Sequence, residues 1–361
     1  MKKQKNVSRK KTRAYKKRRN RRIIFTMEVI VLLLAIGVLY VVNKLNKIGS
    51  DDLNLELVET NPGVSSNEVL DGYTNIALFG VDSREANLDA GALSDMIMIA
   101  SINNKTKEVR LVSVYRDSLL DTKNGSFRKA TEAFSLGGKE RAISMLNINL
   151  DLDIKAHVIV DFNAVAEVVD LLDGIDLEIT DDEMVHINNY CVETSRVTGK
   201  DYTPLQESGM VHLNGVQAVS YSRIRQTEGG DFQRSARQRF VIGLLVDKLK
   251  ASDILTINKI IDKVFPMVST SFTKSQILGM VVDALNYELG ETGGFPTANK
   301  PYNDIYINGE YRGHVIVPVT LEENVKQLHQ FLFGDEAYTP SSKVQEISQE
   351  IINITGYTSL E

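Results

Sequence analysis

A chain of 361 residues is long enough for one large domain or two medium-sized domains. Hydrophobic residues make up 43% of it and charged residues 25%, which excludes a disordered chain, a collagen-like repeat and a multi-span membrane protein. The single cysteine, Cys191, excludes an intramolecular disulfide framework and a cysteine-based zinc cluster.

The net charge of -5 hides an uneven distribution along the chain. Residues 1–22 contain 13 of the 42 Lys and Arg residues and no acid, so residues 23–361 carry 29 bases against 47 acids. Residues 23–42 are apolar apart from Glu28, and a helix of that length spans roughly 30 Å, the thickness of bilayer hydrocarbon. A basic segment before an apolar span predicts a single-pass signal anchor in the cell membrane, with a cytoplasmic N-terminus and the rest of the chain on the wall side.

Two alternatives compete with this anchor. A cleaved signal peptide needs a shorter apolar region and a small-residue cleavage site, whereas residues 40–44 read Tyr-Val-Val-Asn-Lys. The basic segment 1–22 could also bind nucleic acid, but it leads directly into the apolar span, so we expect no nucleic-acid partner.

Beyond the span, the polar residues 43–72 predict an extracellular linker with little fixed structure, and ordered structure is expected over 73–334, with a loose tail at 335–361. Apolar runs predict strands at 75–80, 96–102, 109–115, 156–162 and 175–179, the second and third forming a hairpin. Helical periodicity predicts helices at 137–150, 163–172, 213–221, 232–249 and 321–333, with two more within 252–289 and a hairpin around Asn308-Gly309. This mixture predicts an α/β fold with a mixed sheet.

The first residues that suggest chemistry flank the first two strands. Asp82 and Arg84 follow Gly80 at the end of one strand, and Asp95 directly precedes the next, so both carboxylates are expected at one sheet edge. Two carboxylates brought together repel unless a cation joins them, and carboxylate and phosphate oxygens are the usual ligands of Mg²⁺. The alternative is a pair of solvated loop acids.

Two basic residues follow the third strand. Arg116 could bind a phosphate with its planar fork while Asp117 holds it in place, or the two could form only a surface salt bridge. Lys129, which precedes Gly137-Gly138, could likewise touch a phosphate or belong only to a turn. No G-x-S-x-G, P-loop or H-E-x-x-H motif is present.

The densest basic cluster lies at residues 223–239, in a part of the chain that is otherwise acidic. Arg223 and Arg225 share one side of an extended segment. Arg234 and Gln238 share a helix face near N-terminal N–H groups that attract anions, and Arg237 could join them. The cluster predicts a pocket for a polyanion such as a pyrophosphate, and a solvated basic helix face is the alternative.

Six segments resemble motifs of the LytR-CpsA-Psr family and occur in that family's order over residues 75–250. They are FGVDSR (79–84), SDMIMIASIN (94–103), LVSVYRDSLL (111–120), RKATEAFSLGG (128–138), LNGVQAVSYSRIR (213–225) and DFQRSARQRFVIGLL (231–245). The departures are Thr131, where the family often has asparagine, and Tyr115, where it often has proline. Neither departure removes a charge.

The resemblance implies a wall-side phosphotransferase that uses Mg²⁺ or Mn²⁺. Such enzymes move a glycopolymer, with its terminal phosphate, from a polyprenyl-pyrophosphate carrier onto a peptidoglycan sugar hydroxyl. It also implies an α/β/α sandwich after the transmembrane helix, in which Asp82 and Asp95 hold the metal ion. The implied catalytic residues are Asp82, Asp95, Arg116, Arg223 and Arg225, and the implied pyrophosphate ligands are Arg84, Arg116, Lys129, Arg223, Arg225, Arg234, Arg237 and Gln238.

An apolar groove for the prenyl tail is also implied. Apolar residues that could line it are Val165, Val168, Val169, Leu171 and Leu172, although most of them are expected to be core.

Other functions remain open at this point. A hydrolase of the same pyrophosphate lipids needs the same residues, with water as the acceptor. A transcription regulator or attenuator would use residues 1–22 on DNA, but no helix-turn-helix pattern follows them, and a non-catalytic wall-binding protein would tolerate the loss of Asp82 and Asp95. The sequence does not identify the polymer (teichoic acid, capsule or similar), the acceptor sugar, the general base or the oligomeric state.

Overall fold

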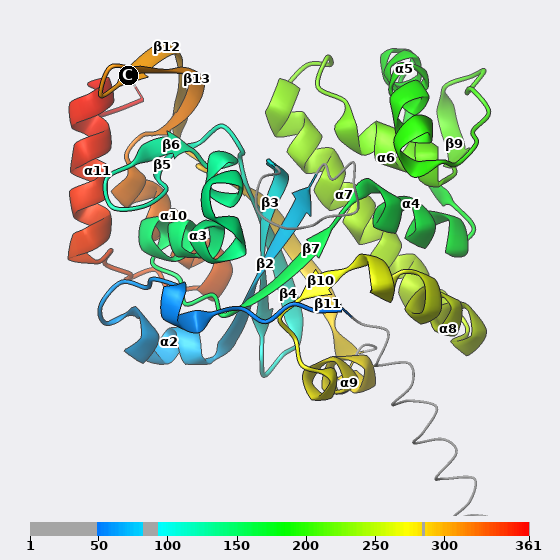
Figure 1. Ribbon diagram of the computed structural model, residues 1–361, viewed down its shortest axis with the longest axis horizontal. Coiled ribbons are helices and arrows are strands. Elements are labelled where there is room, and N and C mark those ends of the chain that lie inside the picture. Colours follow the sequence, from blue (N-terminus) through cyan, green and yellow to red (C-terminus); the bar gives the residue numbers. More distant parts are fainter. Residues whose placement is uncertain (1–48, 82–92, 284–285, 361) are drawn as a thin grey trace, which may run out of the picture. The chain divides into compact units, whose positions relative to one another are not determined.

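A seven-stranded mixed sheet lies at the centre of the protein in this computed structural model, which describes residues 49–81, 93–283 and 286–360 (Figure 1). Its strands, in spatial order, are β1 (Gly49–Ser50), β10 (Ser269–Thr270), β7 (Ala156–Val160), β2 (Tyr73–Val81), β3 (Ser94–Asn103), β4 (Glu108–Val114) and β11 (Glu288–Phe295). β2, β3 and β4 pair antiparallel, whereas β7 runs parallel to β2 and β11 parallel to β4. The predicted mixed sheet and the β3–β4 hairpin are confirmed.

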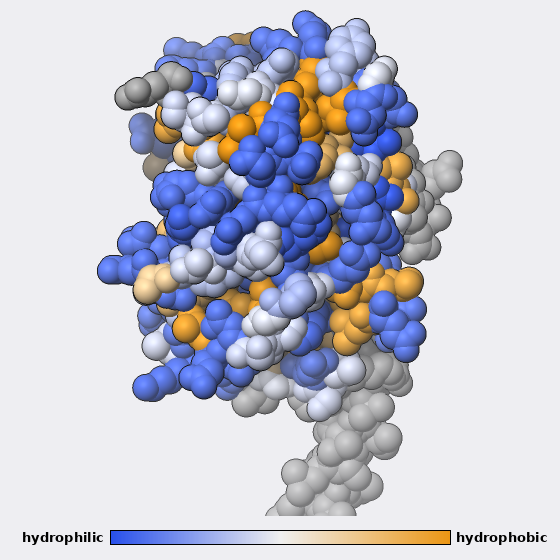
Figure 2. All heavy atoms as spheres, turned by 90° about the vertical axis from the view of Figure 1, so that its left-hand side faces the viewer, coloured by the Kyte–Doolittle hydropathy of each residue, from blue (hydrophilic) through white to orange (hydrophobic). Residues whose placement is uncertain are grey.

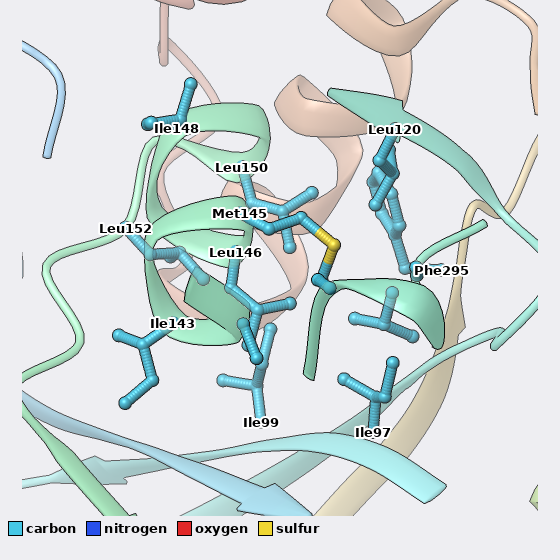
Figure 3. Close-up of a cluster of buried hydrophobic side chains, with 14 of the residues drawn as sticks. Ile97, Ile99, Leu120, Ile143, Met145, Leu146, Ile148, Leu150, Leu152 and Phe295 are labelled. Atoms are coloured by element: carbon cyan, nitrogen blue, oxygen red, sulfur yellow. The ribbon is translucent and has the colours of Figure 1, made fainter. Parts of the chain in front are cut away.

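One face of the sheet is covered by α3 (Glu132–Leu150), α10 (Leu321–Phe333) and α11 (Ser342–Thr355). Because side chains alternate along a strand, Ile97 and Ile99 both point to this face and pack with Ile143 and Leu146 of α3 (Figure 3). All four side chains are almost completely buried, and each such burial contributes roughly 1.5–3 kcal/mol.

The opposite face is covered by α7 (Gly230–Ala251) and α9 (Lys274–Asp283). Met98, whose neighbours Ile97 and Ile99 face α3, packs here with Leu111 and with Ile242 of α7. The sheet therefore lies between two helical layers, which confirms the expected layered α/β architecture.

A further group of elements stands beside the sheet on the α7 side (Figure 1). It consists of α4 (Phe162–Leu171), β8 (Ile175–Ile179), α5 (Asp181–Thr198), β9 (Gly209–Leu213), α6 (Gly215–Arg223) and α8 (Ile254–Lys263). The sequence analysis did not predict α5 or β9. The N-terminus of α5 has a complete capping box between Thr180 and Glu183, which is a sequence signal for a helix start.

Two short hairpins complete the α3 side. β5 (Leu119–Asp121) pairs with β6 (Phe127–Lys129), and β12 (Asn299–Ile307) pairs with β13 (Glu310–Pro318). The predicted hairpin around Asn308-Gly309 is therefore confirmed, and both residues adopt the positive φ that its turn requires.

The linker predicted for residues 43–72 is ordered from Gly49 onward, which corrects that expectation. It contains η1 (Leu55–Leu57), η2 (Val64–Ser66) and α2 (Glu68–Asp71). Val64 and Leu70 are buried in the main core, and Asn61 donates from Nδ2 to Asp151 Oδ1 at 2.6 Å. The buried side chains of Val64 and Leu70 therefore hold this mostly polar segment against the rest of the domain.

The prediction of a loose tail over 335–361 is wrong. Ser341 caps α11 by accepting from the Val344 N–H at 3.3 Å, and Val344, Ile347 and Ile351 are buried against the main core. Seen from the side on which α11 lies, the surface is mainly hydrophilic, with apolar side chains in separate patches (Figure 2). The helix thus buries one apolar stripe and presents its polar residues to solvent.

The basic segment and the apolar span predicted at residues 1–42 lie outside the described residues. Within the described ranges, every helix is too short or too polar to cross a bilayer.

Candidate functional site

A pocket of about 310 Å³ lies where the sheet edge meets α4, α6 and α7. The last residues of β2 and β7, Val81 and Val160, line it together with Asp95 at the start of β3. Arg116, two residues beyond β4, completes this wall. The pocket therefore sits at the strand ends, where α/β sheets commonly place ligands.

Arg116 and Asp95 form the centre of the polar end. Arg116 donates from Nη1 to Asp95 Oδ1 at 2.5 Å, and its Nε lies 3.7 Å from Asp117 Oδ2 and 3.8 Å from Asp231 Oδ1. Burial lowers the pKa of Arg116, but the nearby carboxylates of Asp95 and Asp117 outweigh it and raise that pKa. Arg116 therefore carries a full positive charge at the pocket wall.

Asp231 also joins two further arginines, a role that the sequence analysis missed. Arg234 lies 2.8 Å from Asp231 Oδ1 through Nη2 and donates to the Asp95 carbonyl at 3.2 Å, while Arg225 Nε lies 3.6 Å from Asp231 Oδ1. Burial raises the pKa of Asp231, and Arg116 and Arg225 oppose that shift. The signal was present in the sequence, since Asp231 and Arg234 are three residues apart in the first turns of α7.

Two of the arginines that line the pocket each have a buried guanidinium nitrogen with no hydrogen-bond acceptor among the described residues. These nitrogens are Nε of Arg116 and Nε of Arg234. Buried donors are normally satisfied, so these two are suited to an oxyanion that enters the pocket.

Arg223 approaches the pocket from α6 and is held by a different set of contacts. Its guanidinium lies 4.7 Å from the ring centroid of Phe162 and 5.3 Å from that of Tyr190. It also donates to Thr194 Oγ1 at 2.9 Å and to Glu193 Oε2 at 2.8 Å. Stacking and hydrogen bonding together fix the plane of this arginine. The sequence analysis did not identify Phe162 and Tyr190, which both line the pocket.

The structure brings together Asp95, Arg116, Arg223, Arg225, Arg234 and Gln238, which all line this pocket. Lys129 is attached to the cluster indirectly, because its Nζ lies 3.3 Å from Asp117 Oδ1.

Arg237 does not reach the pocket, which corrects its assignment as a pyrophosphate ligand. Its Nη2 lies 2.8 Å from Glu183 Oε1 on α5 and donates to Thr227 Oγ1 at 2.7 Å, and its Nη1 donates to the Ile224 carbonyl at 3.3 Å. The side chain is buried and its donors are occupied within the protein. Arg237 therefore joins α7 to α5 and to the loop after α6.

Asp82 and Arg84 lie outside the described residues. Among the residues that are described, no group of three or more His, Cys, Asp or Glu side chains is arranged to hold a metal ion. Asp95 supplies one carboxylate to the pocket, and the bond from Arg116 uses only part of its acceptor capacity. The Asp95 carboxylate is thus compatible with binding a hard cation whose remaining ligands come from groups outside the described residues.

The opposite end of the pocket is apolar. On α7 the lining changes from Arg234 and Gln238 to Val241, Ile242 and Leu245. The twelve residues from Arg234 to Leu245 cover about 17 Å of helix. The facing apolar side chains include Val160, Val165 and Val219.

Of the groove residues that the sequence suggested, Val165 lines the pocket, whereas Val169 and Leu172 are buried in core clusters. The pocket as a whole therefore suits an amphiphile with an anionic head and a long apolar tail.

The LytR_cpsA_psr family model matches residues 38–320 of this chain. A curated relative, the polyisoprenyl-teichoic acid–peptidoglycan teichoic acid transferase TagV of Bacillus subtilis, is 30% identical over 267 residues, which are 70% of this chain and 65% of TagV. The chain thus spans slightly less than two thirds of that relative's length.

Solved structures share the fold. The crystal structure of Bacillus subtilis TagV has a TM-score of 0.54 at 23% identity, covering 74% of this chain and 98% of that one. An Enterococcus faecalis protein described as a transcriptional regulator has a TM-score of 0.58 at 22% identity, covering 82% and 99%.

Proposed function

Because this chain belongs to the LytR_cpsA_psr family, we propose that it is a membrane-anchored phosphotransferase of the cell wall. It moves a glycopolymer, with its terminal phosphate, from a polyprenyl-pyrophosphate carrier onto a sugar hydroxyl of peptidoglycan. The observation that carries this proposal is the pocket wall formed by α7, on which Arg234 and Gln238 are followed by Val241, Ile242 and Leu245.

The polar end fits the pyrophosphate. Arg116, Arg225 and Arg234 converge there around shared carboxylates, and Arg223 enters from α6. Guanidinium groups bind phosphate oxygens through paired N–H donors, and several of them neutralise the charge of a diphosphate. The prenyl tail then lies along Ile242 and Leu245.

The reaction is a displacement at phosphorus. The acceptor hydroxyl oxygen forms a bond to the phosphorus that carries the glycopolymer, and the bond from that phosphorus to the bridging oxygen breaks. Polyprenyl phosphate leaves with that oxygen, and the hydroxyl proton goes to a base. Such a transfer depends mainly on positioning and on stabilisation of charge, which the arginines supply without a covalent nucleophile.

A divalent cation, Mg²⁺ or Mn²⁺, belongs to the same proposal. Asp95, together with Asp82, would hold it beside the pyrophosphate end of the pocket. The cation would neutralise charge on the phosphate oxygens. Removal of divalent cations with EDTA should then stop transfer, and Mg²⁺ should restore it.

The proposed topology places this pocket on the wall side. The apolar span 23–42 and the basic segment before it support a cytoplasmic N-terminus and a single crossing. An anchored enzyme meets its lipid-borne donor at a raised effective concentration.

The test is a transfer assay with the purified full chain, a polyprenyl-pyrophosphate-linked glycopolymer and peptidoglycan. Teichoic acid is the first donor to use, because the TagV relative is named for it. We expect covalent attachment of the polymer to peptidoglycan, and loss of attachment with Arg223→Ala or Asp95→Ala. Normal transfer by both variants would refute the assignment of the site, whereas polymer released into solution with none attached would favour the hydrolase.

A further inference from the structure

The loop and helix start that follow α7 present apolar side chains to solvent. Within the α7–α8 corner, defined as residues 250–259, Ile254 is 79% exposed and Leu255 is 67% exposed. Both belong to the first turn of α8, whose later residue Ile260 and C-cap residue Val264 are buried. Two adjacent large aliphatic side chains at this exposure are costly in water unless another surface covers them.

The charge of the α7–α8 corner is basic, although the part of the chain after residue 22 has an excess of acids. Lys250 and Lys259 are exposed on either side of Ile254 and Leu255. The acid within the corner, Asp253, caps α8 by accepting from the Thr256 N–H at 2.7 Å. Apolar side chains flanked by lysines are typical of surfaces that lie in the headgroup region of an anionic membrane.

The corner is also placed at the apolar end of the pocket. Leu245 lines that end, and Leu245 and Leu249 pack in one cluster with Ile260 of α8 and its C-cap residue Val264. α8 therefore packs next to the apolar end of the pocket. The direction from Arg234 to Leu245 along α7 continues toward Ile254 at the start of α8.

The start of the described chain lies near the C-terminal end of α8, opposite to the end that carries Ile254. β1 begins at Gly49 and lies beside β10 and η3 (Phe265–Met267), and η3 directly follows α8, which is about 15 Å long. The predicted span ends at Val42, so the six residues 43–48 separate it from Gly49, and an extended chain of that length reaches about 20 Å. The length of residues 43–48 therefore limits how far Gly49 can lie from the end of the predicted span.

We propose that the α7–α8 corner is a membrane-contact surface, which inserts Ile254 and Leu255 among the headgroups of an anionic bilayer and holds the apolar end of the pocket against the lipid. The role of this membrane contact rests on the proposed function, but the contact itself does not. Its role is to let the prenyl tail pass from the bilayer to the pocket without crossing water. The partner that contacts the α7–α8 corner is thus a lipid surface and not a protein.

The experiment uses the full chain reconstituted in vesicles of phosphatidylcholine and phosphatidylglycerol. Leu255→Cys is labelled with a polarity-sensitive fluorophore, and Met210→Cys is the matched control, because Met210 is 73% exposed but lies on β9. Cys191 is fully buried and does not compete for label in the folded protein. Lipids that carry a doxyl quencher should quench the label at position 255 and leave the label at 210 unchanged.

Equal quenching at both positions, or none at 255, would overturn the proposal. A blue shift at 255 without quenching would also overturn it, because a protein surface would then cover the corner. This readout does not depend on catalysis, so it stands even if the chain transfers no glycopolymer.

A second variant tests the purpose of the contact. Ile254→Asp combined with Leu255→Asp should slow transfer from a vesicle-borne donor by about tenfold or more, because acids replace the two aliphatic side chains that enter the anionic headgroup region in the proposed contact. Transfer from a short-chain donor dispersed in detergent should be unchanged. Equal rates from vesicles for this variant and the unaltered chain would contradict the inference.

Discussion

Arg116 binds Asp95 across two strands of the sheet, with its Nη1 donating to the Asp95 Oδ1 at 2.5 Å. The bond joins a residue two positions beyond β4 to the second residue of β3, and carboxylate oxygens of Asp117 and Asp231 lie near Nε of the same guanidinium. One planar side chain thus organises three carboxylates at the polar end of the pocket.

This relationship predicts that Arg116→Lys will be a severe change although it keeps the charge. A lysine ammonium is a point charge and cannot present fixed, coplanar donors to Asp95 and to a phosphate at once. We expect kcat for glycopolymer transfer to fall by about 10²–10³. Arg196→Lys, on the exposed side of α5, is the matched control and should be silent. Near-normal kcat for Arg116→Lys would show that the network is only structural.

The apolar end of the pocket predicts a dependence on the length of the prenyl tail. Leu245→Asn should reduce kcat/KM for a long-chain donor by about tenfold, because a polar amide replaces a side chain that contacts the tail. A donor with a tail too short to reach Leu245 should react normally. Met210→Asn, an exposed position on β9, should affect neither donor. The same loss with both donors would indicate damage to the fold rather than to the tail site.

A buried histidine predicts how stability depends on pH. His157 on β7 is fully buried, and burial lowers its pKa from 6.5 to about 4, although Asp51 opposes that shift. The unfolded chain therefore binds more protons than the folded chain between about pH 6.5 and pH 4. The contribution of His157 to the free energy of unfolding is fully present above pH 6.5. It is lost as the pH falls toward 4, and the total loss is about 3 kcal/mol.

The measurement is the free energy of unfolding of the full chain in detergent as a function of pH. His157→Leu should flatten the slope between pH 4 and 6.5, while His314→Leu, at an exposed position on β13, should keep it. An unchanged slope in His157→Leu would mean that other groups cause the acid sensitivity.

We predict that a substitution in the buried face of the C-terminal helix α11 lowers stability, whereas the sequence analysis expected a loose tail there. Ile351 on α11 is almost fully buried in the main core, so Ile351→Ala should lower the free energy of unfolding by about 2–5 kcal/mol. Gln349→Ala, on the exposed face of the same helix, should change it by less than about 0.5 kcal/mol. A loose tail would give no difference between the two variants.

The elements that build the pocket could be predicted from the sequence because each has a strong local signal. The strands are continuous apolar runs, and Asp95 and Arg116 lie at their ends. Arg234 and Gln238 share a helical face by spacing alone, and both line the pocket.

Spacing could not separate Arg234 from Arg237, because both lie on α7 and are three residues apart. Arg237 turns to Glu183 on α5, a helix that was itself missed because its buried apolar residues are few, although its capping box and acidic start signal a helix. The α11 stripe of Val344, Ile347 and Ile351 has helical spacing, so its periodicity was available in the sequence, but only the structure supplies the surface it covers.

The most direct test of the central claim is a structure of the protein with a bound polyprenyl pyrophosphate. We predict that the pyrophosphate oxygens lie within hydrogen-bond distance of Arg223, Arg225 and Arg234, with the prenyl chain against Ile242 and Leu245. A headgroup bound away from these arginines, or a prenyl chain outside the α4–α6–α7 pocket, would contradict the account.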